Sequence, residues 1–333
     1  MDPVSQAVVG GAFASVAASR KRLLAASILG CISAMVPDLD ILIKSTTDPL
    51  LAIEFHRHFT HALIFIPFGG LIVTTILFPI LRYFFNFKTA YGISTIGYGT
   101  HGLLDACTSY GTVLLWPFSD ARIAWNIISI IDPVFTLTIV GFIVLIMITK
   151  KKLFCLLCTA WILGYLVLGL YQHERALKKI TLLAAQRNHL PNKIIVKPSI
   201  GNLVLWKSVY SYNDYFYIDA IRVFDSSLVC PGEKILKFNL EKHIPKLDKS
   251  SQQALDIERF RWFSSDHVGF IASSRYIIDV RYSVIPNTTD PLWGIGVDVN
   301  KGREQHVKWI TTRNAKSRDF RQLINLIKGR GCF

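Results

Sequence analysis

The stretch HRHFTHALIFIPFGG, residues 56–70, places three histidines directly before an apolar segment. From Ala62 the chain carries no charged residue until Arg82, a length close to the roughly 20 residues that a helix needs to cross a bilayer. Ionisable side chains at membrane depth are unfavourable and mark functional sites by default. The stretch therefore predicts a membrane helix with a functional site at its start.

The composition of the whole chain favours a membrane protein. Its 333 residues are 51% hydrophobic, and the mean hydropathy is +0.37. The net charge of +14 is uneven, because residues 1–172 hold 11 Lys and Arg against 8 Asp and Glu, whereas residues 173–333 hold 26 against 15. Beside a membrane domain, such a basic surplus favours lipid partners with anionic head groups. The surplus is diffuse and follows no recognition motif, so we expect no nucleic-acid partner.

Six apolar segments predict the helices of a polytopic membrane domain over residues 1–171: 4–19, 23–37, 62–81, 91–106, 127–149 and 153–171. The third, fifth and sixth segments are long enough for full spans. The other three are short and rich in Gly, Ala and Ser, which predicts helices packed closely inside the bundle or partial spans.

Three basic clusters predict the orientation of these helices: Arg20 to Arg22, Arg82 with Lys88, and Lys150 to Lys152. With six spans, all three clusters fall on the same side of the membrane, and the positive-inside rule makes that side cytoplasmic. We therefore expect residues 38–61, residues 107–126 and everything after Tyr171 on the outer side.

The remainder of the chain predicts a different kind of structure. HERALKKITLLAAQRN (173–188) indicates a helical linker over residues 172–192. Residues 193–333 alternate apolar with polar residues and are rich in Val, Ile, Tyr and Trp, which predicts a small β-rich extramembrane domain of α+β character. Near its end, RDFRQLINLIKGR (318–330) predicts a basic amphipathic helix that rests on the sheet or on the bilayer surface. Cys230 and Cys332 can pair if this domain lies outside the cytosol.

Seven ionisable residues fall at the outer ends of the predicted helices: Asp38, Asp40, His56, His58, His61, His101 and Asp105. His101 and Asp105 are four residues apart, so a helix places them on one face. Imidazole together with carboxylate suits zinc first, and manganese, iron or nickel less specifically. The set is large enough for one metal ion or two.

Each of these residues also has a purely structural interpretation. A histidine at a helix end is commonly an interfacial residue with a hydrogen bond, Asp38 can cap a turn, and Asp105 can pair with Arg122. His58 points away from His56 if the stretch is helical. What favours a metal site is that three separate segments bring His or Asp to one level of one bundle.

Several motifs in order resemble the YdjM-type family of inner-membrane proteins, which are inferred to be metal-dependent hydrolases: MDPVSQAVVGGA (1–12), PDLD (37–40), HRHFTHAL (56–63), THGLLDACTSYGTVLLWPF (100–118) and IIDP (130–133). Residues 190–223 and 259–270 resemble the soluble extension that many members carry. The resemblance implies a location in the bacterial inner membrane and a divalent metal cofactor, with zinc favoured. It also implies metal ligands at the matched positions Asp38, Asp40, His56, His61, His101 and Asp105.

The chain departs from the family pattern at two places. The family opening is usually Asp-Pro-x-Thr-His, whereas this chain has Ser5 and Gln6 at the last two positions. The family's His-Arg-Gly-x-Thr-His is here HRHFTH, with His58 in place of the glycine. Our hypothesis is that His58 compensates for the missing ligand or that Gln6 coordinates weakly through its carbonyl oxygen.

The function that these features favour is a membrane-bound metal-dependent hydrolase. An uncoordinated acid, which we expect to be Asp38, Asp40 or Asp132, would take a proton from the attacking water. Arg57 or Arg122 would stabilise the developing negative charge. Because the site is expected at the outer head-group level, a lipid or lipid-linked ester or phosphoester is the expected substrate. Asp132, which directly precedes Pro133, has an equal structural alternative as a helix cap.

Two other functions stay open from the sequence. A transporter or metal-handling protein also needs His and Asp in the membrane, although its polar residues should follow the depth of the membrane. Alternatively, the membrane domain is an anchor and the β-rich domain is a binding module.

Overall fold

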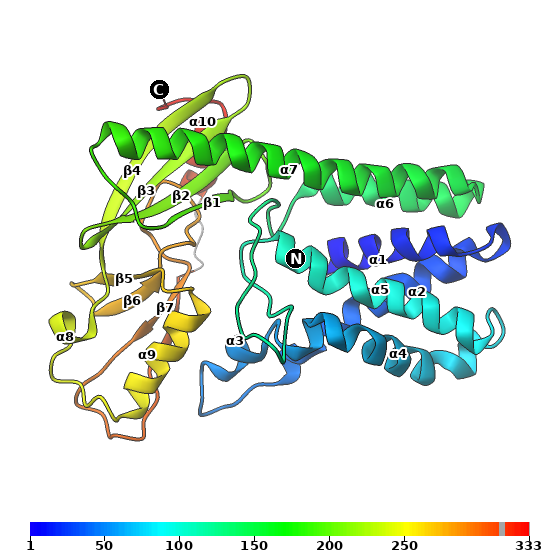
Figure 1. Cartoon of the computed structure of the whole chain (residues 1–333), viewed down its shortest axis with the longest axis horizontal. Helices are drawn as coiled ribbons and strands as arrows, with labels where there is room; N and C mark the ends of the chain where they lie inside the picture. The colour runs from blue at the N-terminus through cyan, green and yellow to red at the C-terminus, as the bar shows by residue number, and fades with distance from the viewer. Residues whose placement is uncertain (313–316, 333) are drawn as a thin grey trace. The chain divides into compact units, whose positions relative to one another are not determined.

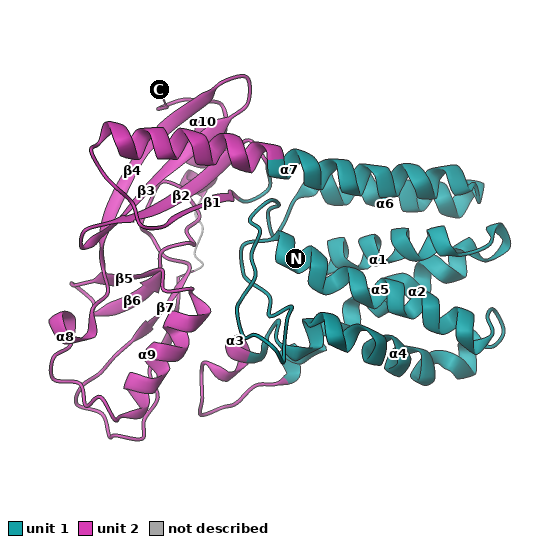
Figure 2. Cartoon of the chain, in the orientation of Figure 1, with its two compact units in different colours: residues 1–42, 55–170, 200–202 teal, residues 43–54, 171–199, 203–333 magenta. Residues whose placement is uncertain are grey.

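The computed structural model describes residues 1–312 and 317–332 and divides the chain into two compact units, coloured teal and magenta in Figure 2. Unit 1 comprises residues 1–42, 55–170 and 200–202, and unit 2 comprises residues 43–54, 171–199 and 203–333. The segment 43–54 thus belongs to unit 2, although the residues before and after it in the sequence belong to unit 1.

Unit 1 is a bundle of helices (Figure 1). Its long helices are α1 (Pro3–Ala17), α2 (Leu23–Met35), α4 (Ile66–Leu81), α5 (Phe87–Cys107), α6 (Pro133–Thr149) and the first half of α7 (Lys152–Gln186). Short turns and helices lie between them: η1 (Arg20–Arg22), η2 (Val36–Leu42), α3 (Leu51–Phe55), η3 (Phe59–His61) and η4 (Leu63–Phe65). All six predicted segments contain a helix, which confirms the helical N-terminal half.

Side-chain caps fix where several of these helices begin. The carboxylate of Asp2 accepts a hydrogen bond from the backbone N–H of Ser5 (3.0 Å), and proline follows it in the first turn of α1. Asp132 repeats this arrangement ahead of Pro133, because its Oδ1 accepts from the backbone N–H of Phe135 (3.2 Å). Helix α6 therefore begins at Pro133 and has 17 residues, so the span predicted over 127–149 is shorter than expected.

Glycines allow α1, α2 and α5 to pack almost backbone to backbone. A Cβ atom on Gly10 would lie 2.6 Å from the carbonyl oxygen of Gly30, and one on Gly97 would lie 2.7 Å from that same oxygen. No larger residue fits at either position without moving a helix. The small residues of these short segments thus place them against one another in the bundle, as predicted.

Three helices of the described residues are long and apolar enough to cross a membrane: Arg20–Leu42, Leu63–Leu81 and Lys152–Gln186. The first is longer than the predicted segment 23–37 because the turns η1 and η2 extend α2 at both ends. Helices α1 and α6 are apolar but shorter. The arrangement with six membrane helices is therefore not confirmed.

The three basic clusters lie in or directly beside the turns between α1 and α2, α4 and α5, and α6 and α7, and these turns are all at one end of the bundle (Figure 1). Helix α7 continues without a break through Tyr171, so the last predicted span and the start of the predicted linker form one helix of 35 residues.

Unit 2 contains an eight-stranded antiparallel sheet in which each strand pairs with the next one along the chain. The strands are β1 (Ile194–Pro198), β2 (Leu205–Tyr212), β3 (Tyr215–Val223), β4 (Ser227–Lys237), β5 (Val268–Ile271), β6 (Tyr276–Asp279), β7 (Trp293–Gly296) and β8 (Lys308–Thr311). In β2 and β3, Leu205 pairs with Arg222 and Tyr212 with Tyr215 across a tight hairpin. The prediction of a β-rich domain is confirmed.

Three helices complete unit 2: α8 (Leu240–His243), α9 (Gln252–Phe263) and α10 (Ser317–Ile327). Helix α10 is the predicted amphipathic helix, and its Leu323 and Leu326 pack against Leu205 and Ala220 of the sheet. Of the two alternatives, the helix therefore rests on the sheet. Beside it, Cys230 forms a disulfide with Cys332.

Candidate metal centre

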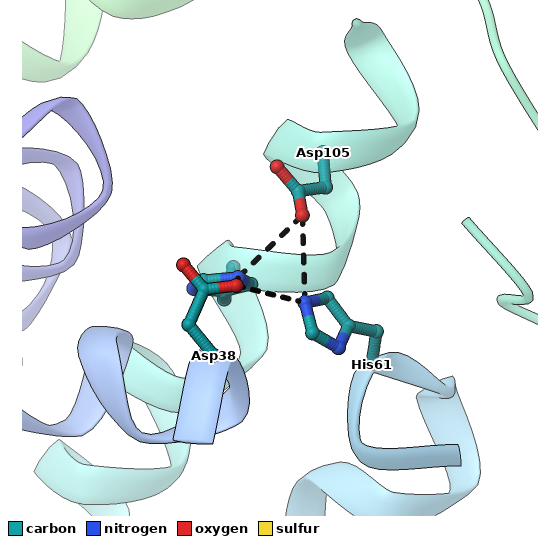
Figure 3. A group of neighbouring side chains, drawn as sticks. Asp38, His61 and Asp105 are labelled. Carbon is teal, nitrogen blue, oxygen red and sulfur yellow. Dashed lines mark ion pairs between the residues drawn. The ribbon is translucent and has the colours of Figure 1, made fainter. Parts of the chain in front are cut away.

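Four side chains from three segments of unit 1 converge on one point. Asp38 lies on η2, His61 ends η3, and His101 and Asp105 lie one turn apart on α5. Figure 3 shows Asp38, His61 and Asp105 turned toward one another, with dashed lines marking the ion pairs. We call these four residues the unit 1 cluster.

The separations within the unit 1 cluster suit a tetrahedral metal ion. His61 Nε2 lies 3.5 Å from Asp38 Oδ1 and 3.4 Å from Asp105 Oδ2. His101 Nε2 lies 3.2 Å and 3.5 Å from the same two oxygens. Zinc with four ligands at about 2.0–2.1 Å places the ligand atoms about 3.3–3.4 Å apart. The four side chains therefore fit a single ion of this kind.

The second ring nitrogen of His101 fixes how this residue faces the cluster. Its Nδ1 donates a short hydrogen bond to the carbonyl oxygen of Ala34 on α2. In the neutral ring this leaves Nε2 without a proton and with its lone pair toward the cluster, where it has no hydrogen-bond partner. Histidine ligands of metals typically donate their other N–H in this way.

His61 is oriented in the same manner by Asp40. The Nδ1 atom of His61 lies 3.3 Å from Asp40 Oδ2 and 3.0 Å from the hydroxyl of Thr60, and Nε2 has no hydrogen-bond partner. Asp40 Oδ2 also accepts from the Thr60 hydroxyl (3.1 Å) and from the backbone N–H of Arg57 (2.9 Å). Asp40 is thus placed to orient His61, and whether it is itself a ligand stays a prediction.

Asp105 is buried and is surrounded by donors. Its Oδ2 lies 3.0 Å from Nε of Arg57, and its Oδ1 accepts from the side-chain amide of Gln6 (2.8 Å) and pairs with the amino group of Met1. The carbonyl oxygen Oε1 of Gln6 is buried without a hydrogen-bond partner. Our hypothesis named His58 and Gln6 as replacements for the missing family ligand. Of these two residues, Gln6 is the one that lies at the unit 1 cluster.

The carboxylates create a strongly negative field at His61. Burial by itself would lower the pKa of His61, but the neighbouring carboxylates of Asp105, Asp38 and Asp40 raise it to about 10. The field that holds a proton on this imidazole is also one that favours a divalent cation, which would replace that proton.

His56 and Asp40 form a pair beside the cluster. His56 Nδ1 lies 2.8 Å from Asp40 Oδ1. Asp38, Asp40 and His56 also make a second group whose ligand atoms all lie within 4.8 Å of one another. Asp38 belongs to both groups, so the arrangement has room for one ion or for two that share this carboxylate.

The unit 1 cluster is open to solvent on one side only. The side chains of His61, His101 and Asp105 are 0% exposed, whereas Asp38 is 26% and His56 24% exposed. The exposed side of the site is therefore formed by Asp38 and His56.

Two other residues of the sequence-based prediction, His58 and Asp132, lie outside the unit 1 cluster. The His58 ring packs between Phe55 and Trp116, with ring centroids 5.6 Å and 6.1 Å away. Asp132 caps α6, and its Oδ2 accepts from the hydroxyl of Tyr165 (2.9 Å). Both carboxylate oxygens of Asp132 therefore accept structural hydrogen bonds, as its interpretation as a helix cap suggests.

The two arginines are held beside the ring of Tyr110, with guanidinium carbons 4.8 Å (Arg57) and 5.4 Å (Arg122) from its centroid. Arg57, and not Arg122, pairs with Asp105. Nη2 of Arg122 donates to the carbonyl oxygens of Gly111 (2.9 Å) and His56 (3.4 Å). Arg122 is thereby placed next to His56, which is more exposed than His61 and His101.

A third group of His and Asp residues lies in unit 2 and was not predicted: Asp48, Asp256 and His306. The guanidinium of Arg259 already bridges it, because Nη1 lies 3.1 Å from Asp48 Oδ1 and 3.0 Å from Asp256 Oδ1. Nη2 of Arg259 also reaches Glu54 at 2.6 Å. We call Asp48, Glu54, Asp256, Arg259 and His306 the unit 2 cluster. This ion-pair network connects the segment 43–54 to α9.

Sequence analysis also missed Thr60 and the carbonyl of Ala34, which orient His61 and His101. A carbonyl has no sequence signal, and the only available sign for Thr60 was its place before His61.

Among protein families, the model of the YdjM inner membrane protein family matches residues 1–176. No curated protein and no solved structure matches. The match covers more than half of the chain, which therefore belongs to the YdjM inner membrane protein family.

Proposed function

From this family membership and the geometry of the unit 1 cluster, we propose that the protein is a membrane-bound metal-dependent hydrolase. The observation that carries the proposal is the set of four N and O atoms, 3.2–3.5 Å apart across their His–Asp pairs, with the second nitrogen of each histidine held from outside. Two carboxylates and two imidazoles also form a donor set that suits a divalent ion, and zinc is the ion that this set favours.

The residues around the cluster fit hydrolytic chemistry. A divalent metal supplies Lewis acidity, which polarises an ester or phosphoester and makes water more acidic. His56 then takes the proton of the attacking water on Nε2, because Asp40 holds the Nδ1 proton. Arg57 neutralises Asp105, and the neighbouring Arg122 stabilises negative charge that develops on the substrate. His56 therefore replaces Asp38, Asp40 and Asp132 as our candidate base.

Two independent features support action at the outer face of the inner membrane. The basic turns lie at one end of the bundle, and by the positive-inside rule that end is cytoplasmic. The unit 1 cluster lies at the ends of α2 and α5 away from those turns. The Cys230–Cys332 disulfide of unit 2 also fits an oxidising compartment. A site at this level would meet lipid head groups, so we propose a lipid or lipid-linked ester or phosphoester as substrate.

A transporter would need ionisable groups along the depth of the bundle, whereas the His and Asp groups of unit 1 gather at one end. An anchored binding module would leave the unit 1 cluster without a role. Both alternatives predict that a purified, metal-loaded protein turns over no ester.

The experiment that tests the proposal uses the full chain in detergent with ester and phosphoester lipids, and compares His56→Gln with His58→Gln. His56→Gln should keep its metal and lose hydrolysis by about 10²- to 10⁴-fold, the typical contribution of a general base. His58→Gln, whose ring lies among aromatic side chains, should keep both. Metal-loaded wild type without turnover, or equal loss in the two variants, would contradict the proposal.

A further inference from the structure

A groove of about 400 Å³ lies between α2, α4 and α6 at the end of the bundle opposite the unit 1 cluster. Its floor is formed by the buried Leu29 and Ile146, and its walls include the exposed Ile28 and Ile80. The apolar lining on a membrane domain suits a hydrocarbon chain better than water.

The rim of this groove is strongly basic. Arg20, Lys21, Arg22 and Lys150, which come from two separate turns, all line it. Among the described residues, none of these four side chains forms an ion pair with a carboxylate. The rim therefore holds four positive charges that no acidic group within residues 1–312 and 317–332 neutralises.

The length of the groove matches one leaflet of a bilayer. From Arg22 to Ile32, both of which line it, α2 rises by about 15 Å at 1.5 Å per residue. This is half of the roughly 30 Å hydrocarbon core of a membrane. A ligand with its charge at the rim would thus extend an acyl chain along α2 toward the middle of the bilayer.

A second groove on the same bundle gives the contrast. It lies between α1, α5 and α7, measures about 620 Å³ and is lined by residues such as Phe13, Leu103 and Leu163. None of its lining residues is charged, so it offers acyl chains a surface but gives a head group nothing to bind. Charge at the rim, and not the volume or the apolar lining, distinguishes the first groove.

We propose that the groove between α2, α4 and α6 is a binding site for one anionic glycerophospholipid. The phosphate of the anionic head group pairs with Arg20, Arg22 and Lys150, and one acyl chain lies along Ile28 and Ile32. Arginine suits the phosphate because its planar guanidinium binds two oxygens at once. The site is independent of the proposed hydrolase activity.

The test is native mass spectrometry of the full detergent-solubilised chain, titrated with palmitoyl-oleoyl phosphatidylglycerol or phosphatidylcholine. Wild type should retain one phosphatidylglycerol in preference to phosphatidylcholine. The triple variant Arg20→Gln/Arg22→Gln/Lys150→Gln should bind phosphatidylglycerol roughly 100-fold more weakly, as expected for three lost charges near a lipid surface. Inorganic phosphate at the same concentration should not displace the lipid, because it has no acyl chain for the groove.

The matched control, Lys88→Gln/Lys151→Gln/Lys152→Gln, removes the same charge from the same end of the bundle but from residues that do not line the groove. It should weaken binding by less than about tenfold, because exposed charges at a distance are screened. Ile80→Trp, at a position 65% exposed, should block the acyl chain with every charge in place. Equal effects of the two triple variants, equal retention of both lipids, displacement by phosphate, or full binding by Ile80→Trp would each overturn the proposal.

Discussion

The unit 1 and unit 2 clusters both gather His and Asp side chains, but they differ in what neutralises the carboxylates. In unit 2 a guanidinium bridges Asp48 and Asp256, and His306 Nδ1 lies 2.9 Å from Asp256 Oδ2. In unit 1, Arg57 and the amino group of Met1 both pair with Asp105, and the Nε2 atoms of His61 and His101 face inward without hydrogen-bond partners.

From this difference we propose that the unit 1 cluster binds a metal cation, whereas in unit 2 the guanidinium of Arg259 already occupies the space between the carboxylates. Residue types alone would class both clusters as metal sites. The orientation of each imidazole decides between them, because a metal ligand must turn a lone pair inward and its proton outward. We therefore expect substitutions in the unit 2 cluster to change stability, and those in the unit 1 cluster to change metal binding.

The largest stability effect is expected for Arg259→Leu. Removing the guanidinium leaves the buried carboxylate of Asp256 without its cation, and breaking such a pair costs about 3 kcal/mol or more. Hydrogen exchange of the full chain should show faster exchange in α9 and in residues 43–54, with metal content unchanged.

Arg261→Leu on the same helix is the control, since Arg261 pairs with the exposed Glu258 and Asp266. Loss of such surface pairs costs less than about 1 kcal/mol. If both substitutions had the same effect, the unit 2 cluster would have no special structural role.

Asp40→Asn should weaken metal binding by about 10- to 100-fold, because Asp40 orients His61 without being a ligand in the unit 1 cluster. Competition with a chelator of known affinity measures the change. The exposed Asp120→Asn is the control. Complete loss of metal would instead make Asp40 a ligand, as the family resemblance implies.

A smaller effect concerns the pH dependence of unit 2. Burial lowers the pKa of Lys207 to about 7, although the nearby acids Asp279 and Glu233 act in the opposite direction. The unfolded chain, with a lysine pKa near 10.4, therefore binds more protons than the folded one between about pH 7 and 10. The contribution of Lys207 to stability should therefore rise with pH in this window by at most about 1.4 kcal/mol per pH unit.

Hydrogen exchange in β2 and β3, corrected for the intrinsic pH dependence of exchange, measures this slope. Lys207→Met should flatten it, whereas the exposed Lys246→Met should leave it unchanged. The same slope in wild type and in Lys207→Met would show that Lys207 remains charged in the folded protein.

Much of the fold could be predicted because local patterns determine it. The apolar segments predict the helices, and alternation predicts the sheet. The start of α6 could also have been predicted, since Asp132 and Pro133 are typical of a helix start. The apolar residues before Asp132 instead led to a predicted segment that begins six residues too early. The continuity of α7 could not be predicted in this way. The change from apolar to polar residues at Tyr171 marks a change of environment, but it does not end the helix.

For the site, the sequence could indicate which residues are polar in an apolar half, but not the direction in which each side chain points. His58 and His61 lie three residues apart, so a helix would place both on one face. The turn at residues 57–58 instead directs the His58 ring toward Trp116 and the His61 ring toward Asp105. The pairing of Asp48 with Arg259 joins residues 211 positions apart, which no local pattern predicts.

The most direct test of a metal site in unit 1 is the metal content of the purified full chain, reloaded with zinc and desalted. Wild type is compared with His61→Ala/His101→Ala and with Asp256→Asn/His306→Gln. We predict a stoichiometric metal ion in the wild type and in the unit 2 variant, and loss of that metal in the unit 1 variant while the helical content is retained. A folded wild type without metal, or a metal that is lost with the unit 2 residues, would contradict this account.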